Sequence, residues 1–103
     1  MAYTIGTTPT FVLEFSAEEV DLAEAENLYV TIKQGHKELT YTGDDLVLEG
    51  NSIKVYLPQE ESLKFKPGII EIQANWTYGD GDRACSDIVQ LEADRNLLMR
   101  FIE

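Results

Sequence analysis

The chain has 103 residues, which is the length of one domain, and no internal repeat divides it. Nineteen Asp and Glu against eight Lys and Arg give a formal net charge of -11 at pH 7. This surplus of acids argues against nucleic acid and against anionic membrane surfaces as partners, because both are bound through clustered Lys and Arg. The hydrophobic fraction of 44% is too high for an acidic disordered chain, so we expect a folded domain.

Cysteine content and hydropathy further limit the class of protein to which this chain can belong. Cys85 is the only cysteine, which excludes an intrachain disulfide, and its place in a predicted strand indicates a buried apolar side chain. No stretch reaches the roughly 18 apolar residues of a membrane helix, and the N-terminus lacks the basic start of a signal peptide. We therefore expect a protein that is cytoplasmic when it is synthesised and that has no membrane partner.

Alternating apolar and polar residues predict three strands in the first half of the chain, Thr10–Phe15, Asn27–Gln34 and Lys37–Thr42. The apolar positions of each strand fall on one face, which we expect to point into a core: Phe11, Leu13, Phe15, Leu28, Val30, Ile32, Leu39 and Tyr41. Between the first two strands, the segment Ser16–Glu26 begins with the serine-to-glutamate spacing of a capping box, which predicts a turn or two of helix.

The next two strands form a predicted hairpin. Leu46–Glu49 and Ser52–Leu57 flank Gly50-Asn51, which fits a two-residue type II′ turn because glycine accepts a positive φ without steric cost. This turn sets the pairs Leu48 with Ile53 and Leu46 with Val55.

A second helical turn is predicted over Pro58–Phe65. Pro58 suits the first helical position, and Leu63 and Phe65 can close the end of a core.

A longer hairpin is predicted from Ile69–Tyr78 and Arg83–Ala93. With a loop of two or four residues, Tyr78 faces Arg83, and the register then pairs Trp76 with Cys85, Ile72 with Val89 and Ile70 with Leu91. Asp87 would point inward in this register, so we expect a β-bulge near Ser86–Ile88 that turns it outward. Trp76 is expected to anchor the core and not to serve as a ligand platform.

The last segment, Asp94–Glu103, has a helical pattern. Leu97, Leu98, Phe101 and Ile102 form an apolar stripe behind Asp94 as a cap, which predicts a short C-terminal helix. With Met99, these apolar residues are the candidate protein interface. Two interpretations are open: the segment folds back over its own core, or it docks on a neighbouring subunit.

About seven short strands with turn signals every 8–12 residues indicate an all-β fold, and we predict an immunoglobulin-like antiparallel β-sandwich forming a single domain over residues 1–103. A β-barrel is the main competing architecture.

Residues suited to catalysis or cofactor binding are scarce. His36 is the only histidine and lies in a turn context, and the sequence has neither a nucleophile elbow nor a phosphate-binding glycine loop. Asp80 and Asp82 alternate in a glycine-containing loop, as calcium ligands do, but the twelve-residue loop with a closing Glu is missing. We expect ordinary turns there and at Asp44-Asp45, and therefore no catalytic residues, no metal and no cofactor.

Three stretches also carry a resemblance: Gly6-Thr7-Thr8-Pro9-Thr10-Phe11, Gly50-Asn51-Ser52-Ile53, and Gln59-Glu60-Glu61-Ser62-Leu63 followed by Gly68. They resemble small immunoglobulin-like proteins encoded in prophage and mobile-element clusters of gut bacteria. The resemblance covers most of the chain and implies a virion-associated role, in a tail or baseplate. It carries over no catalytic residue.

The expected function is therefore non-enzymatic. The first hypothesis is a structural or adaptor component of a phage-like particle, with other protein subunits, including further copies of itself, as partners through Leu97, Leu98, Met99, Phe101 and Ile102. The alternative is a carbohydrate- or receptor-binding module that uses loops or the exposed ones among Tyr3, Tyr29, Tyr41, Tyr56 and Tyr78.

Overall fold

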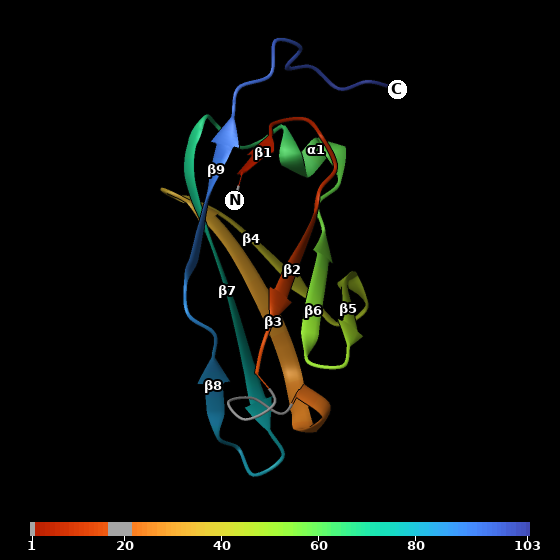
Figure 1. Ribbon diagram of the computed structural model, residues 1–103, viewed down its shortest axis with the longest axis vertical. Helices are drawn as coiled ribbons and strands as arrows, with labels where there is room; N and C mark the ends of the chain where they lie inside the picture. Colours follow the sequence, from red (N-terminus) through yellow and green to blue (C-terminus); the bar gives the residue numbers. More distant parts are fainter. Residues whose placement is uncertain (1, 17–21) are drawn as a thin grey trace.

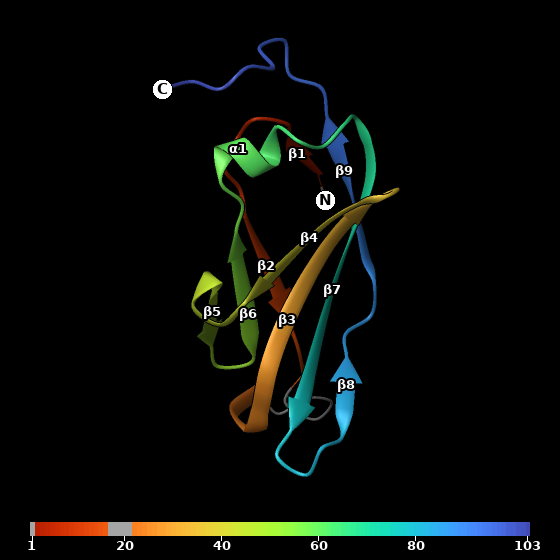
Figure 2. The ribbon, with the colours of Figure 1, turned by 180° about the vertical axis from the view of Figure 1, so that it is seen from behind.

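The computed structural model describes residues 2–16 and 22–103, which form a sandwich of two β-sheets (Figure 1). The large sheet has the order β1-β9-β7-β3-β4, and β8 pairs with the lower end of β7 (Figure 2). The bounds of these strands are β1 Ala2–Thr4, β3 Ala25–Gln34, β4 Lys37–Thr42, β7 Gly68–Tyr78, β8 Arg83–Cys85 and β9 Val89–Asp94. The small sheet has the order β2-β6-β5, with β2 at Thr10–Glu14, β5 at Leu46–Glu49 and β6 at Ser52–Tyr56.

The strand orders confirm the predicted all-β sandwich. In immunoglobulin variable-type domains one sheet contains strands B, E and D and the other contains G, F, C and C′. The orders β2-β6-β5 and β9-β7-β3-β4 reproduce these two arrangements in chain order. The first strand differs from the constant-type domain, in which strand A joins the sheet of B, E and D, because β1 pairs in parallel with β9 and leaves β2 at the edge of the small sheet.

The core lies between the two sheets and is built from the alternating positions that the sequence predicts. Phe11, Leu13, Val30 and Ile32 are buried there. Trp76 is 1% exposed, and its ring meets that of Phe15 edge to face at 5.6 Å, so its predicted role as a core anchor is confirmed.

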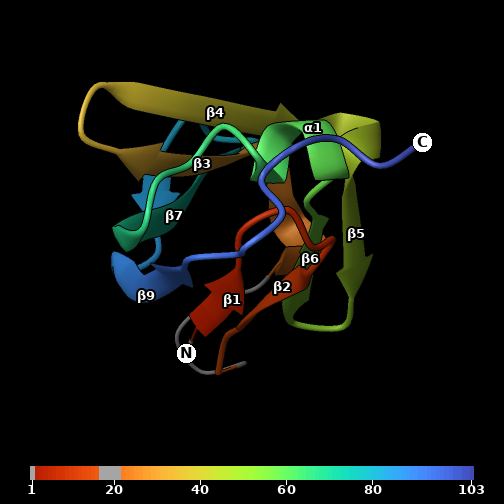
Figure 3. The ribbon, with the colours of Figure 1, turned by 90° about the horizontal axis from the view of Figure 1, so that it is seen from above.

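The upper end of the sandwich is closed by the short helix α1 (Gln59–Ser62), as Figure 3 shows from above. Pro58 occupies the N-cap position of this helix, one position before the first helical position that the sequence predicts for it. Phe65 is buried and Leu63 half-buried against the core, as expected. Of the helical turn predicted for Ser16–Glu26, residues 17–21 lie outside the described residues. Leu22–Glu24 is a single 3-10 turn, η1, and β3 starts directly after it.

The hairpin of β5 and β6 has the predicted register. Leu48 pairs with Ile53 and Leu46 with Val55. Gly50 has a φ of +57°, as the first central residue of a type II′ turn requires. Leu48 is nevertheless 48% exposed, because β5 is an edge strand. The turn predicted at Asp44-Asp45 is the 3-10 turn η2 (Gly43–Asp45).

The hairpin of β7 and β8 differs from the predicted register by one residue. The Tyr78 amide donates to the Asp82 carbonyl and the Gly81 amide donates to the Tyr78 carbonyl, both at 2.9 Å, so the loop comprises three residues. Gly81 has the positive φ, +91°, that closes such a loop. The sequence predicts a loop of two or four residues. Either length would pair Tyr78 with Arg83, one residue away from the observed pairing of Thr77 with Arg83.

This shift exchanges the two faces of β8. Ala84 pairs with Trp76 and is half-buried, whereas Cys85 pairs with Asn75 and is exposed. The prediction that Cys85 is buried is therefore wrong, and so is its pairing with Trp76. Its side chain lies on the side of the large sheet that faces away from the core.

The predicted register returns in β9, where Ile72 faces Val89 and Ile70 faces Leu91. The change between the two registers takes place at Ser86–Ile88, the segment where a bulge was expected, and Asp87 is exposed there.

The predicted C-terminal helix is wrong. Residues 95–103 form neither helix nor strand and cross the upper end of the sandwich above α1 (Figures 1 and 3). A short amphipathic helix gains most of its stability from packing its apolar stripe, and these side chains have no surface to pack on.

Candidate protein-interaction surfaces

The predicted interface residues all lie in residues 95–103, called here the C-terminal segment. The exposed fractions of Leu97, Leu98, Met99, Phe101 and Ile102 range from 42% to 92%. Such a run of apolar side chains in water is a mark of a binding surface. Of the two open interpretations, folding back over the core finds no support in the structure, since the segment crosses the end of the sandwich without burying these side chains.

Two polar side chains hold the C-terminal segment in place. The side-chain amide of Asn96 donates a hydrogen bond to the Ile5 carbonyl at 3.0 Å. Further on, the Gln59 side chain accepts from the Ile102 amide at 2.7 Å and donates to the Ile102 carbonyl at 3.1 Å. The contacts with Gln59 are exposed, so water can replace them at little cost.

The end of the sandwich under this segment is rigidly built. Ser62 is fully buried, and its hydroxyl oxygen accepts from the Gly6 amide at 2.9 Å. The Tyr3 hydroxyl donates to the Ser62 carbonyl at 3.3 Å. Gly6 has a φ of +92°, and a Cβ there would lie 3.2 Å from Leu63 Cδ2, so this close approach favours glycine. β1, α1 and the loop after β1 are thereby joined.

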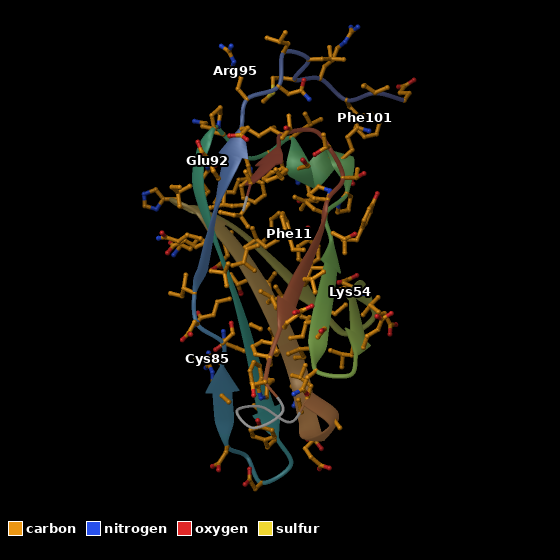
Figure 4. The ribbon with its side chains drawn as sticks, in the orientation of Figure 1. Phe11, Lys54, Cys85, Glu92, Arg95 and Phe101 are labelled. Atoms are coloured by element: carbon orange, nitrogen blue, oxygen red, sulfur yellow. The ribbon has the colours of Figure 1, made fainter. Side chains whose placement is uncertain are left out.

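A cleft of about 400 Å³ opens on the side of the sandwich between β2 and the β8–β9 connection, and we call it the side cleft. Its lining is mainly apolar and comes from both sheets: Phe11, Val12, Leu13, Glu14, Phe15, Ile72, Cys85, Ser86, Asp87, Val89 and Leu91. Figure 4 shows Phe11 between the sheets and Cys85 on β8. The cleft lies where an A strand would cover β2 in an immunoglobulin domain.

The edge of β2 that borders the side cleft is free. The Phe15 amide donates to the Asn51 carbonyl at 2.9 Å, so the backbone groups of Phe15, and by alternation those of Leu13 and Phe11, point to β6. The backbone groups of Thr10, Val12 and Glu14 therefore point away from β6. Within residues 2–16 and 22–103, no strand pairs with that edge.

The opposite wall of the side cleft is held by Ser86. Its amide donates to the Ala74 carbonyl and its hydroxyl accepts from the Ala74 amide, both at 2.9 Å. The Gln73 side chain donates to the Ser86 carbonyl at 2.9 Å. These contacts replace the ladder where β8 and β9 change register, so the wall stays attached to β7 while Asp87 projects outward.

Sequence reasoning did not identify the side cleft. It results from the pairing of β1 with β9, and β1 has only three residues. The alternation of Tyr3 and Ile5, both of which are buried in the structure, is the signal in the sequence that could have revealed this strand.

The tyrosines named for the alternative function do not gather at one site. Tyr3 is buried and Tyr41 is half-buried, while Tyr56 lies on the outer face of the small sheet. Tyr29 is 46% exposed in a shallow polar groove on the outer face of the large sheet. Asn27, Asn75, Thr77 and Arg83 line the groove with it, and the Arg83 guanidinium donates a hydrogen bond to Oδ1 of the Asn75 side chain at 3.0 Å.

The remaining candidate residues lie in turns. His36 is exposed between β3 and β4. The Asp80 carboxylate accepts a hydrogen bond from the Asp82 backbone amide at 2.9 Å, which is the usual role of aspartate in a tight turn. In the part of the chain that the structure describes, no three His, Cys, Asp or Glu side chains come together as they would around a metal ion.

Comparisons with protein-family models, with curated proteins and with solved structures give no match. None of the described helices has the length and apolar character needed to cross a membrane.

Proposed function

We propose that this protein is a non-enzymatic structural or adaptor component of a phage-like particle, in its tail or baseplate region, and that it acts through protein–protein contacts. The observation that carries the proposal is the C-terminal segment, which holds five large apolar side chains in water at one end of a rigid sandwich. Fully burying one such side chain is worth about 1.5–3 kcal/mol, so a partner that covers several of them would bind stably.

The distribution of charge supports the same surface. The chain as a whole carries a net charge of -11, whereas the C-terminal segment contains Arg95, Arg100 and a single acid, Glu103. An acidic coat keeps the rest of the sandwich apart from other proteins, and the segment is the place where this repulsion is weakest. The tail or baseplate setting rests on the resemblance of Gly6–Phe11, Gly50–Ile53 and Gln59–Leu63 to proteins of prophage clusters.

The proposal is tested with the products of the neighbouring genes. The chain is co-expressed with each of them, and complexes are measured by size-exclusion chromatography with light scattering. We expect a complex with a virion protein that is lost in the variant Leu97→Ser/Phe101→Ser. The matched control is Val47→Ser/Tyr56→Ser, which removes two large exposed side chains from the small sheet. Neighbours without virion genes, or a complex that both variants keep, would contradict the proposal.

One observation favours the alternative of a carbohydrate- or receptor-binding module. The groove around Tyr29 combines an exposed aromatic ring with amide, hydroxyl and guanidinium groups, which is the usual chemistry of a sugar site. A glycan array with the native protein and with Tyr29→Ala tests it, and Tyr56→Ala is the control because that ring is 54% exposed on the other sheet. Signals that all three proteins share, or no signal, would count against this function.

A further inference from the structure

We propose that the C-terminal segment of one copy of this protein enters the side cleft of a second copy and pairs, as an added strand, with the free edge of β2. The inference rests on the proposed function, since it names the partner of the same apolar segment. It makes the protein a head-to-tail assembling unit, because the inserted segment and the cleft that receives it are different surfaces.

The pattern of the C-terminal segment fits an inserted strand. In an extended backbone, side chains at every second position share a face, so Leu97, Met99 and Phe101 would point together. The side cleft offers apolar side chains of both sheets to that face, among them Leu13 and Val89. Residues 97–101 also equal β2 in length, since β2 has five residues.

The backbone groups at the cleft are those that strand addition uses. Thr10, Val12 and Glu14 direct their amides and carbonyls to the open side of β2. An extended peptide that pairs with such an edge gains main-chain hydrogen bonds and places alternate side chains in the groove. An immunoglobulin domain fills this position with its own A strand, which here lies on β9.

Charge at the rim also favours the C-terminal segment as the occupant. Glu14 and Asp87 border the side cleft. In the extended segment, Arg100 lies on the face opposite to Met99 and therefore beside the outward side chains of β2, where Glu14 is a cross-strand neighbour of opposite charge. Other parts of this acidic chain would bring further negative charge to the same rim.

The segment of the same copy is poorly placed for its own cleft. It leaves β9 at Asp94 in the direction away from the cleft (Figure 1). The edge of β9 at that point is occupied, because the Ile5 amide donates to the Asp94 carbonyl at 2.9 Å and β1 pairs with residues 92–94. A segment from a second copy meets no such obstacle. The hydrogen bonds that it has to release first are exposed: the two between Ile102 and Gln59, and the one that the Leu98 amide donates to Asn96 Oδ1.

The main test is the mass of the protein in solution, measured by light scattering over a concentration series. We expect the native chain to form dimers and longer oligomers as concentration rises. Val12→Pro removes an amide from the free edge of β2 without touching the β6 ladder. Met99→Asp places a charge on the inserted face. We expect each variant to weaken association at least tenfold.

The control is Leu48→Pro, which removes an outward amide from β5 at the other edge of the same sheet. It should associate like the native chain. A mixture of Val12→Pro and Met99→Asp is the sharpest measurement, because the first keeps a working segment and the second a working cleft. The mixture should give dimers and nothing longer. A native chain that stays monomeric, or a mixture without dimers, would overturn the inference.

A covalent probe keeps the inference testable should Val12→Pro fail to fold. Val89 lines the side cleft, is half-buried and pairs with the buried Ile72, so its side chain faces the inserted strand. Cys85, the only cysteine, points to the other face of the large sheet and is replaced by alanine. Met99→Cys/Cys85→Ala is mixed with Val89→Cys/Cys85→Ala and oxidised with diamide, which should yield a disulfide-linked dimer of the two variants. Val47→Cys/Cys85→Ala in place of the Met99 variant should not, because Val47 lies on the outer face of the small sheet. Equal yields from the two mixtures would refute the inference.

These outcomes separate the two proposals. A native chain that stays monomeric alone but binds a virion protein through Leu97 and Phe101 would end the inference and leave the proposed function standing.

Discussion

The Tyr78 amide donates its hydrogen bond to the Asp82 carbonyl at 2.9 Å, and this one contact decides which side of β8 faces the core. It makes the loop three residues long, so Ala84 lies opposite Trp76 and the next side chain along the strand faces water. Glycine on both sides of Asp80 gives no preference between loop lengths at the level of sequence.

The first prediction concerns the reactivity of the Cys85 thiol on β8 toward a thiol reagent. In dilute native protein, Cys85 should react with Ellman's reagent nearly as fast as in the unfolded chain, because its side chain is exposed. In the variant Ala84→Cys/Cys85→Ala, the thiol sits opposite Trp76 and should be protected. Rapid reaction of the variant together with slow reaction of the native chain would mean that the two faces are exchanged.

The second prediction concerns two neighbours on β7. Ile72 is buried and Glu71 is exposed. Ile72→Ala should lower the free energy of unfolding by about 2–5 kcal/mol through lost burial and the cavity left behind, whereas Glu71→Ala should change it by about 0.5 kcal/mol or less. Urea denaturation of both variants checks the values, and a larger effect at Glu71 would contradict the register of β7.

The third prediction concerns the buried hydroxyl of Ser62. Ser62→Ala leaves the Gly6 amide without its acceptor, which should cost about 1–3 kcal/mol of unfolding free energy. Thr7→Ala is the control, because its hydroxyl donates to the Thr4 carbonyl at the surface and should matter little. The measurement is again urea denaturation, and equal effects of the two variants would mean that the Ser62 hydroxyl does not support the end of the sandwich.

The fourth prediction concerns Tyr41, whose hydroxyl is buried and has no hydrogen-bond partner within the described part of the chain. Burial, helped by the nearby negative charges of Glu61 and Asp45, raises the pKa of Tyr41 to about 12. The folded protein therefore keeps this proton where the unfolded chain loses it, above the ordinary value of 10.0. Stability should be unaffected by this group below pH 10 and should fall between pH 10 and about 12.

The measurement is the urea midpoint of the native chain and of Tyr41→Phe at several values of pH. The variant should be as stable as the native chain or more stable near neutral pH, because it removes an unsatisfied buried hydroxyl. It should also lose less stability at high pH. Part of the loss should persist, since burial also raises the pKa of Tyr3, although its hydrogen bond to Ser62 acts in the opposite direction. Identical pH profiles would contradict the burial of Tyr41.

Much of the sandwich follows from local patterns. A strand that buries one face shows alternating apolar and polar residues in the sequence. For this reason β2, β3 and β4 lie within a residue or two of the predicted ranges. A turn with a strict backbone requirement can also be predicted from the sequence, and the turn at Gly50 sets the register of β5 and β6.

The predictions that are wrong or incomplete have physical causes that cannot be read from the sequence. Residues 95–103 carry an apolar stripe at helical spacing, but a helix of that length needs a surface, and Asn96 and Gln59 hold the backbone in another shape. The side cleft depends on which edge β1 joins, a choice made by packing between segments far apart in the chain. The partner that we propose for the C-terminal segment belongs to a second molecule, and this sequence shows only the exposed apolar side chains that would contact it.

The pairing of β1 with β9 also has a consequence for how the protein is made. Ala2–Thr4 are synthesised well before their partners, Glu92, Ala93 and Asp94. Pairings so distant along the chain close large loops and form slowly. During translation the small sheet can assemble as soon as β6 has left the ribosome, whereas the edge of the large sheet has to wait until β9 has been made. Throughout that interval the nascent protein exposes β1 without its partner strand.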